Sequence, residues 1–178
     1  MSYFSYKNNI LYCEKVKISD IADKYGTPAY IYSKKTLSEN FDAYANAFDK
    51  KSGLICFSVK SLSNLSILKF LSEKGSGFDI VSGGELERTL LAGADPKKII
   101  FTGIAKTDEE ILFGIEKNIL SFNIESKSEM MRIEKIARDK KKLVDVAIRF
   151  NPEIDAGGHE YIKTCLLYTS DAADERLR

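Results

Sequence analysis

The fold is decided by the stretch Phe57-Ser58-Val59-Lys60-Ser61-Leu62-Ser63-Asn64. Here an apolar run, Leu54–Val59, gives way to a helical pattern, so Lys60 is the first polar side chain beyond a predicted buried strand. The carboxyl ends of parallel strands are where barrels and doubly wound sheets bind ligands. A partly desolvated lysine loses its proton more readily and can attack a carbonyl carbon. Lys60 is therefore a candidate nucleophile, the alternative being one more solvated surface lysine.

Downstream of Gly53, short apolar runs alternate regularly with amphipathic segments. The predicted strands are 54–59, 78–81, 98–101, 120–123 and 144–150, and the predicted helices are 64–72, 85–92, 108–117 and 127–140. Capping boxes, Thr107-x-x-Glu110 and Ser126-x-x-Glu129, begin the last two helices, and Gly93 is placed to end the second in a left-handed conformation. Strands that alternate with helices of this length predict βαβ units and a parallel sheet.

Two α/β folds share this pattern, a doubly wound sheet and a (β/α)8 barrel. A nucleotide-binding doubly wound sheet would carry GxGxxG directly after its first strand, whereas Gly75-Ser76-Gly77 precedes a strand here. The sequence therefore favours the barrel. Such barrels need about 250 residues and eight strands. With 178 residues and about five countable strands, we expect an incomplete barrel.

The first part of the chain has a different pattern. We predict strands at 10–13, 16–18 and 29–32, a short helix at 20–25 capped by Ser19 and ended by Gly26, and a longer helix at 35–48. Ser33 is placed to cap the longer helix, whose apolar residues recur every three or four positions. We expect this helix to bury one face.

Further polar residues lie at the predicted strand ends. Asp79 falls within the second strand, and the turn Ser82-Gly83-Gly84-Glu85 leads into the next helix. Two glycines at a helix start allow close approach of a ligand, although a simple tight turn with Glu85 on the helix dipole is the alternative. Arg149 ends the fifth strand, and it either faces a ligand or a partner inside the barrel or lies on the surface.

Composition excludes several classes of function. With 27 basic and 26 acidic residues the net charge is +1, and no basic stripe points to nucleic acid. Cys13, Cys56 and Cys165 have unrelated spacing and His159 is the sole histidine, so we expect no metal site. No signal peptide or membrane-spanning run is visible, and the free cysteines fit a cytoplasmic protein.

Four segments together resemble the diaminopimelate decarboxylase family. They are GTPAYIY (26–32), FSVKSxxN (57–64), GFDIVSGGEL (77–86) and RxNPxxDAxxHxYIxT (149–164). These enzymes are fold-type III pyridoxal phosphate enzymes, related to ornithine and arginine decarboxylases and more distantly to alanine racemase. The resemblance implies an alanine racemase-like barrel over residues 33–164. It also implies that residues 1–32, which precede the barrel, contribute a strand and a helix to a second, β-rich domain.

The resemblance also implies roles for particular residues. Lys60 matches the lysine that holds pyridoxal 5'-phosphate, with Ser61 standing where alanine is usual. The other matched positions, all implied to surround the cofactor, are Asp79, Ser82, Gly83, Gly84, Glu85 and Arg149, with His159 in a segment close to the active site. No metal is implied.

The implied activity is decarboxylation of meso-2,6-diaminopimelate to L-lysine by a cytoplasmic homodimer that acts on a small amino acid. The open alternatives are a decarboxylase of ornithine, arginine or carboxynorspermidine, a racemase, or a fragment that binds the cofactor without turnover. Residues 165–178 resemble no part of the family, and we interpret them as an artefact tail. Because the family places its phosphate loop and further site residues after this point, we expect the chain alone to be inactive.

Overall fold

The computed structural model describes residues 3–48 and 53–150. The chain divides into two units, Met1–Gly53 and Leu54–Arg178. No helix in the described ranges is long and apolar enough to cross a membrane.

The first unit holds a small antiparallel sheet and two helices. The strands are β1 (Phe4–Lys7), β2 (Ile10–Cys13) and β3 (Val16–Lys17), in the order β1-β2-β3, and the helices are α1 (Ile18–Tyr25) and α2 (Lys34–Ala47). Strand β1 was not predicted. It pairs with β2 through the two-residue turn Asn8-Asn9, in which both residues have positive φ (49° and 61°). Such a turn follows the twist of a hairpin, and asparagine tolerates it.

Of three predictions for this unit, one is confirmed and two are wrong. The cap of α2 is confirmed, because the Ser33 hydroxyl accepts a hydrogen bond from the Thr36 N–H at 3.0 Å. The predicted start of α1 is wrong, since the helix begins at Ile18 and Ser19 lies inside its first turn. The predicted strand at 29–32 is also wrong. Its residues favour extended backbone, but a strand also needs a ladder partner, and none pairs with it among the described residues.

The second unit contains the predicted alternation. Its strands are β4 (Cys56–Ser58), β5 (Gly77–Ile80), β6 (Ile99–Phe101), β7 (Ser121–Ile124) and β8 (Val146–Ile148). Its helices are α3 (Leu65–Glu73), α4 (Gly83–Leu91), α5 (Asp108–Lys117) and α6 (Lys127–Asp139), with two 3-10 turns, η1 (Val59–Ser61) and η2 (Pro96–Lys98). All five predicted strands and four predicted helices are confirmed, with ends shifted by a few residues.

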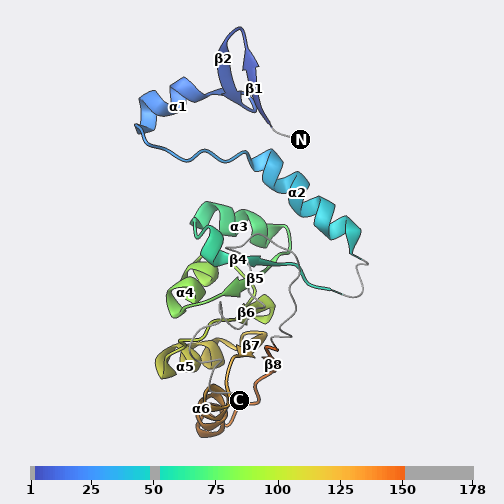
Figure 1. The fold of residues 1–178 in the computed structure, drawn as a ribbon, viewed down its shortest axis with the longest axis vertical. Helices are drawn as coiled ribbons and strands as arrows, with labels where there is room; N and C mark the ends of the chain where they lie inside the picture. Colours follow the sequence, from blue (N-terminus) through green and yellow to red (C-terminus); the bar gives the residue numbers. More distant parts are fainter. Residues whose placement is uncertain (1–2, 49–52, 151–178) are drawn as a thin grey trace. The chain divides into compact units, whose positions relative to one another are not determined.

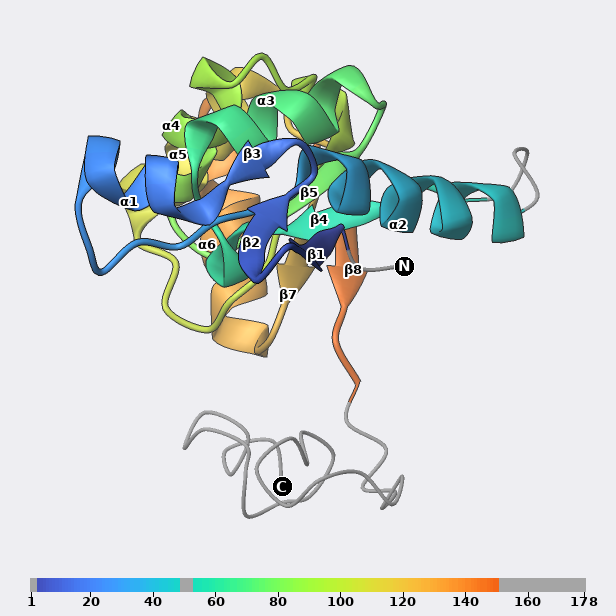
Figure 2. The ribbon, with the colours of Figure 1, turned by 90° about the horizontal axis from the view of Figure 1, so that it is seen from above.

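The five strands form one parallel sheet in the order β4-β5-β6-β7-β8. Because every crossover steps to the next strand in the same direction, the helices must all lie on one side of the sheet. Figures 1 and 2, viewed at right angles, both show α3 to α6 on the same side of the strands. The residues buried between the strands and the helices include Phe78, Ile80, Ile99, Phe101, Phe122 and Ile124. A doubly wound sheet would carry helices on both faces, so the arrangement is that of a barrel arc.

The observed starts of α4, α5 and α6 confirm one predicted capping box and correct the other predicted helix starts. In α5 the Thr107–Glu110 capping box is complete. In α6 the Glu129 side chain accepts instead from the Glu125 N–H, at 2.8 Å, one residue before the cap. Helix α4 begins two residues earlier than predicted, at Gly83, because Ser82 is its cap. Its end is confirmed at Gly93, which has φ 84°.

Candidate active site

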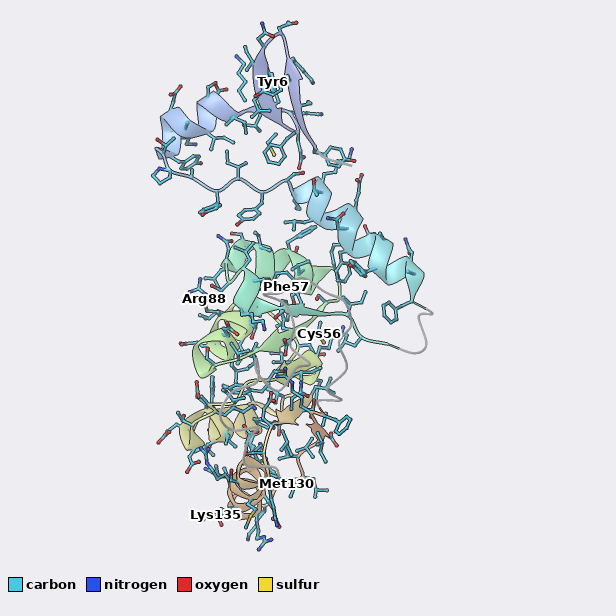
Figure 3. All side chains as sticks on the ribbon, in the orientation of Figure 1. Tyr6, Cys56, Phe57, Arg88, Met130 and Lys135 are labelled. Atoms are coloured by element: carbon cyan, nitrogen blue, oxygen red, sulfur yellow. The ribbon has the colours of Figure 1, made fainter. Side chains whose placement is uncertain are left out.

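Lys60 lies on the 3-10 turn η1, directly after β4, and its side chain is exposed. The turn itself is held on both sides. The Ser61 hydroxyl donates to the Ser58 carbonyl at 2.7 Å, and the Arg88 side chain of α4, labelled in Figure 3, donates to the Ser63 carbonyl at 2.9 Å. The turn also packs against β5. Within the described residues the Lys60 amine has no hydrogen bond or ion pair, so the backbone is fixed and the amine is available.

A second lysine, Lys106, follows the end of β6 and differs from Lys60 in burial and in hydrogen bonding. Its side chain is fully buried and its ammonium donates to the Gly103 carbonyl (2.5 Å), the Asn123 carbonyl (2.8 Å) and the Glu129 carboxylate (2.9 Å). An ammonium has three protons, and all three have acceptors. Lys106 is therefore a structural cation that joins the ends of β6 and β7 to α6.

A row of four polar side chains crosses the sheet on the face opposite the helices, one from the end of each strand from β4 to β7. The two oxygens of Asp79 accept from the Ser58 hydroxyl, at 3.3 Å, and from the Thr102 hydroxyl. The Thr102 hydroxyl in turn accepts from the Asn123 amide at 2.8 Å. All four residues are half-buried. We call Ser58, Asp79, Thr102 and Asn123 the polar row.

Asp79 also affects its surroundings electrostatically. Figure 3 labels Cys56 and Phe57, consecutive residues of β4. Burial raises the pKa of the Cys56 thiol, and the nearby negative charge of Asp79 raises it further. Both effects favour the neutral form of the Cys56 thiol.

The start of α4 brings Ser82, Gly83, Gly84 and Glu85 together, as expected, but their polar groups are largely engaged within the protein. The Glu85 carboxylate accepts from the Val81 N–H at 2.8 Å, and the Ser82 hydroxyl accepts from the Glu85 N–H at 3.2 Å. The Gly83 N–H donates to the Glu110 carboxylate of α5 at 2.7 Å. Space remains at Gly84, where an added Cβ would meet only the Ser82 hydroxyl, at 3.9 Å.

Arg149 follows β8 and is half-exposed, and its guanidinium donates to both oxygens of the buried Glu125, at 3.2 and 3.3 Å. The arginine is therefore paired, which is one of the two outcomes expected for an inward-facing position. A pocket of about 240 Å³ adjoins the pair, lined by Ile124, Glu125, Ser126, Lys127, Met130, Ile148 and Arg149.

Of the sequence-predicted residues, Lys60 and Asp79 lie on elements that pack together, Ser82 to Glu85 form the start of α4, and Arg149 lies at the end of the sheet's last strand. His159 lies outside the described residues. The sequence predicted no site role for Ser58, Thr102, Asn123 or Glu125, although Thr102 directly follows the third predicted strand. A usable signal was present, because each of the four is a polar residue at or just beyond the end of an apolar strand.

Fold and site together define a class of domain, a parallel β/α arc with an available lysine directly after its first strand. The family described as "Pyridoxal-dependent decarboxylase, pyridoxal binding domain" matches residues 34–168. The chain belongs to this family, which confirms the predicted fold class and the pyridoxal cofactor.

Within this family, the chain is similar to proteins named diaminopimelate decarboxylase. The chain is 46% identical over 166 residues to the diaminopimelate decarboxylase of Haemophilus influenzae, covering 93% of this chain and 40% of the relative. It is 47% identical over 156 residues to that of Neisseria meningitidis, covering 88% and 38%. The solved diaminopimelate decarboxylase of M. jannaschii in complex with L-lysine has a TM-score of 0.82 and 35% identity, covering 90% of this chain and 38% of that one. The chain thus spans about 40% of the length of the curated relatives it matches.

Proposed function

We propose that the chain forms the lysine-bearing part of a pyridoxal phosphate-dependent decarboxylase that converts meso-2,6-diaminopimelate to L-lysine in lysine biosynthesis. The observation that carries the proposal is the available amine of Lys60, on a turn that directly follows β4 and packs against β5, the strand of the hydrogen-bonded Asp79 carboxylate. The names of the relatives support the substrate. By the same analogy we propose a cytoplasmic homodimer.

The residues present fit the cofactor. An aldehyde needs an amine without competing partners, and Lys60 provides it while Lys106 does not. A charged aromatic ring with a phosphate needs charged groups in its walls, and Asp79 and Arg149 supply one of each sign. Lys60 would hold the group through Nζ, with Asp79 and Arg149 in the surrounding walls.

When bound, pyridoxal phosphate supplies a sink for the electrons left behind by departing carbon dioxide. The protein's own residues orient and move protons. Lys60 would hold the cofactor, and its amine, when free, would be a base that can take up a proton and return it. The fixed η1 turn holds the backbone of Lys60 directly after β4, so the turn sets the point from which the lysine side chain reaches the cofactor.

A hybrid enzyme tests the proposal. Residues 1–164 of this chain replace the matching part of the Haemophilus influenzae relative, which supplies the remaining length. We expect release of carbon dioxide from meso-diaminopimelate, and loss of at least about a thousandfold in Lys60→Ala, the order of effect of removing a covalent catalytic group. The Lys69→Ala variant, at an exposed helix position, is the matched control and should retain activity. Turnover of ornithine, arginine or carboxynorspermidine in place of diaminopimelate would contradict the proposed substrate.

We further propose that the 178 residues alone do not turn over substrate, because the family places its phosphate-binding loop in the part of the relatives that this chain does not cover. The purified chain should bind pyridoxal phosphate at Lys60 and release no carbon dioxide above the level of Lys60→Ala. Robust decarboxylation by the chain itself would show that the covered part is catalytically sufficient.

A further inference from the structure

We propose that Thr102 and Asn123 are positioning residues of the cofactor site, which act by setting the direction of the hydrogen bonds that end on Asp79. The inference rests on the proposed function and deepens it. Neither residue was assigned a site role from sequence, and within the described residues no hydrogen bond joins either of them to Lys60. Their role follows from the order of donors and acceptors in the polar row.

The direction of the row is determined by its carboxylate. An ionised carboxylate only accepts hydrogen bonds, so Asp79 must receive the single proton of the Thr102 hydroxyl. The Thr102 oxygen can then only accept from its other neighbour, and Asn123 must present its NH2 group, as it does at 2.8 Å. This requirement settles which way the Asn123 amide is turned. Asn123 therefore donates to Thr102, and Thr102 donates to Asp79.

A second donor reaches Asp79 from the opposite side. The Ser58 hydroxyl donates to the other carboxylate oxygen at 3.3 Å, and Ser58 and Asp79 are direct neighbours in the β4–β5 register. On the far side, the pairing of Phe101 with Phe122 places the next residues, Thr102 and Asn123, side by side. Two hydroxyl groups thus reach the Asp79 carboxylate from the strands on either side of β5, and Asn123 of β7 supports the second of them.

The polar row lies near the η1 turn that carries Lys60, and this position suggests what the fixed carboxylate does. Ser58 is two residues before Lys60, and the η1 turn that carries Lys60 packs against β5, the strand of Asp79. A carboxylate already held by two hydroxyl donors needs no reorganisation when a positive charge develops near it. The chemical group that such a carboxylate favours is a cationic nitrogen, either that of Lys60 in its linkage to the cofactor or that of the amino-acid substrate.

The test measures attachment of pyridoxal phosphate to Lys60 in the complete 178-residue chain. Borohydride fixes the pyridoxyl group on each lysine, and peptide mapping reports the labelled fraction at Lys60 and at the surface lysines over a range of cofactor concentrations. We compare the unaltered chain with Thr102→Val, Thr102→Ser and Asn123→Asp, and we record the thermal unfolding midpoint of each.

We expect Thr102→Val to raise the cofactor concentration for half-labelling of Lys60 by about tenfold, the usual effect of losing a hydrogen bond to a charged group. Thr102→Ser keeps the hydroxyl and should restore labelling to within about twofold. Asn123→Asp is nearly isosteric but replaces the donor by an acceptor, so it competes with Asp79 for the one Thr102 proton. It should weaken labelling about as much as Thr102→Val does.

The outcomes separate this inference from the function on which it rests. If the labelled fraction of Lys60 in the unaltered chain is no higher than that of the surface lysines at any cofactor concentration, the proposed function is contradicted and the inference with it. If Lys60 is labelled selectively but Thr102→Val and Asn123→Asp match the unaltered chain, only the inference is overturned. Equal weakening in Thr102→Ser and Thr102→Val would also overturn it, because packing would then be the cause. Should Thr102→Val fail to fold, Asn123→Asp decides.

Discussion

The two faces of the parallel sheet β4–β8 are built from alternate residues of the same strands, yet they have opposite character. On β7, Phe122 faces the helices and is fully buried, whereas Asn123, the next residue, is half-buried in the polar row. On β5, Phe78 and Asp79 show the same contrast. The comparison shows that adjacent residues of one strand serve different ends, one packing in the core and the next contributing to the site. Substitutions on the two faces should therefore affect different measurements.

The largest expected effect on stability is that of Phe122→Ala. The ring is fully buried and stacks on Phe101, with centroids 5.8 Å apart. Removing a buried phenyl ring leaves a cavity and costs about 3–5 kcal/mol of unfolding free energy, which is a large part of the stability of a small domain. Denaturant unfolding followed by circular dichroism measures it.

Two matched variants sharpen the comparison of the faces. Asn123→Ala, one residue on, should cost only about 1 kcal/mol, since it removes one neutral hydrogen bond. Phe150→Ala makes the same chemical change as Phe122→Ala at a residue that is 82% exposed, and should be close to neutral. Similar losses in Phe122→Ala and Phe150→Ala would mean that the helix-facing side is not the core.

The next effect concerns charge buried between the strand ends and α6. Lys106→Met leaves the Glu129 carboxylate without its cation in a site where the two side chains are 0% and 5% exposed. Breaking such a pair from one side costs about 3–5 kcal/mol, less here to the extent that the Glu125 N–H still donates to Glu129. The exposed pair Arg138–Glu134 is the control, and Arg138→Met should cost at most about 1 kcal/mol. Comparable unfolding midpoints for the two variants would contradict a structural role for Lys106.

Local signals in the sequence were enough to predict the second unit. The Thr107–Glu110 capping box and the polar turn that follows gave α5 its observed bounds, Asp108–Lys117. The failures in the first unit had two different causes. Residues 29–32 have strand-favouring side chains but no ladder partner among the described residues, and β1 was overlooked although its turn, Asn8-Asn9, is a recognisable hairpin signal.

The site residues also divide into those that the sequence predicted and those that it did not. Lys60 and Asp79 were predictable because a strand end and a family motif both mark them. Thr102, Asn123 and Glu125 carry the same strand-end signal, but their partners are set by inter-strand register, which places Thr102 beside Asn123 and Glu125 within reach of Arg149. Register is a property of the folded sheet, and single-strand patterns do not contain it.

Two glycines extend the comparison of faces to the helices. An added Cβ at Gly114 of α5 would come within 2.7 Å of the Phe122 ring, so Gly114→Ala should cost about 1–3 kcal/mol through overpacking. At Gly84 of α4 the added Cβ would meet only the Ser82 hydroxyl, at an ordinary contact distance of 3.9 Å, so Gly84→Ala should be neutral or stabilise by up to about 1 kcal/mol. Unfolding midpoints measure both. If the cofactor approaches the start of α4 as the family resemblance implies, Gly84→Ala should weaken labelling of Lys60 without loss of stability.

The smallest expected effect is a dependence on pH at the contact between α5 and the start of α4. Burial raises the pKa of Glu110, but hydrogen bonds from the Gly83 and Thr107 N–H groups and from the Thr107 hydroxyl outweigh it, and the folded pKa lies below the ordinary value of 4.5. Between the folded and the unfolded pKa the unfolded chain binds more protons, so stability rises with pH in that range. The stabilisation is present above about pH 4.5 and is lost as the pH falls through the folded pKa.

Glu110→Gln removes the titrating group while keeping its shape. We expect the variant to be less stable than the unaltered chain at neutral pH, by under about 1 kcal/mol for a half-exposed carboxylate, and the difference to shrink in acid. Urea unfolding of both proteins at about pH 7 and about pH 3 measures the two differences. A difference of the same size at both pH values would show that the Glu110 charge contributes nothing to holding the Gly83 amide. The start of α4 would then depend on its Ser82 cap and the Glu85 carboxylate alone.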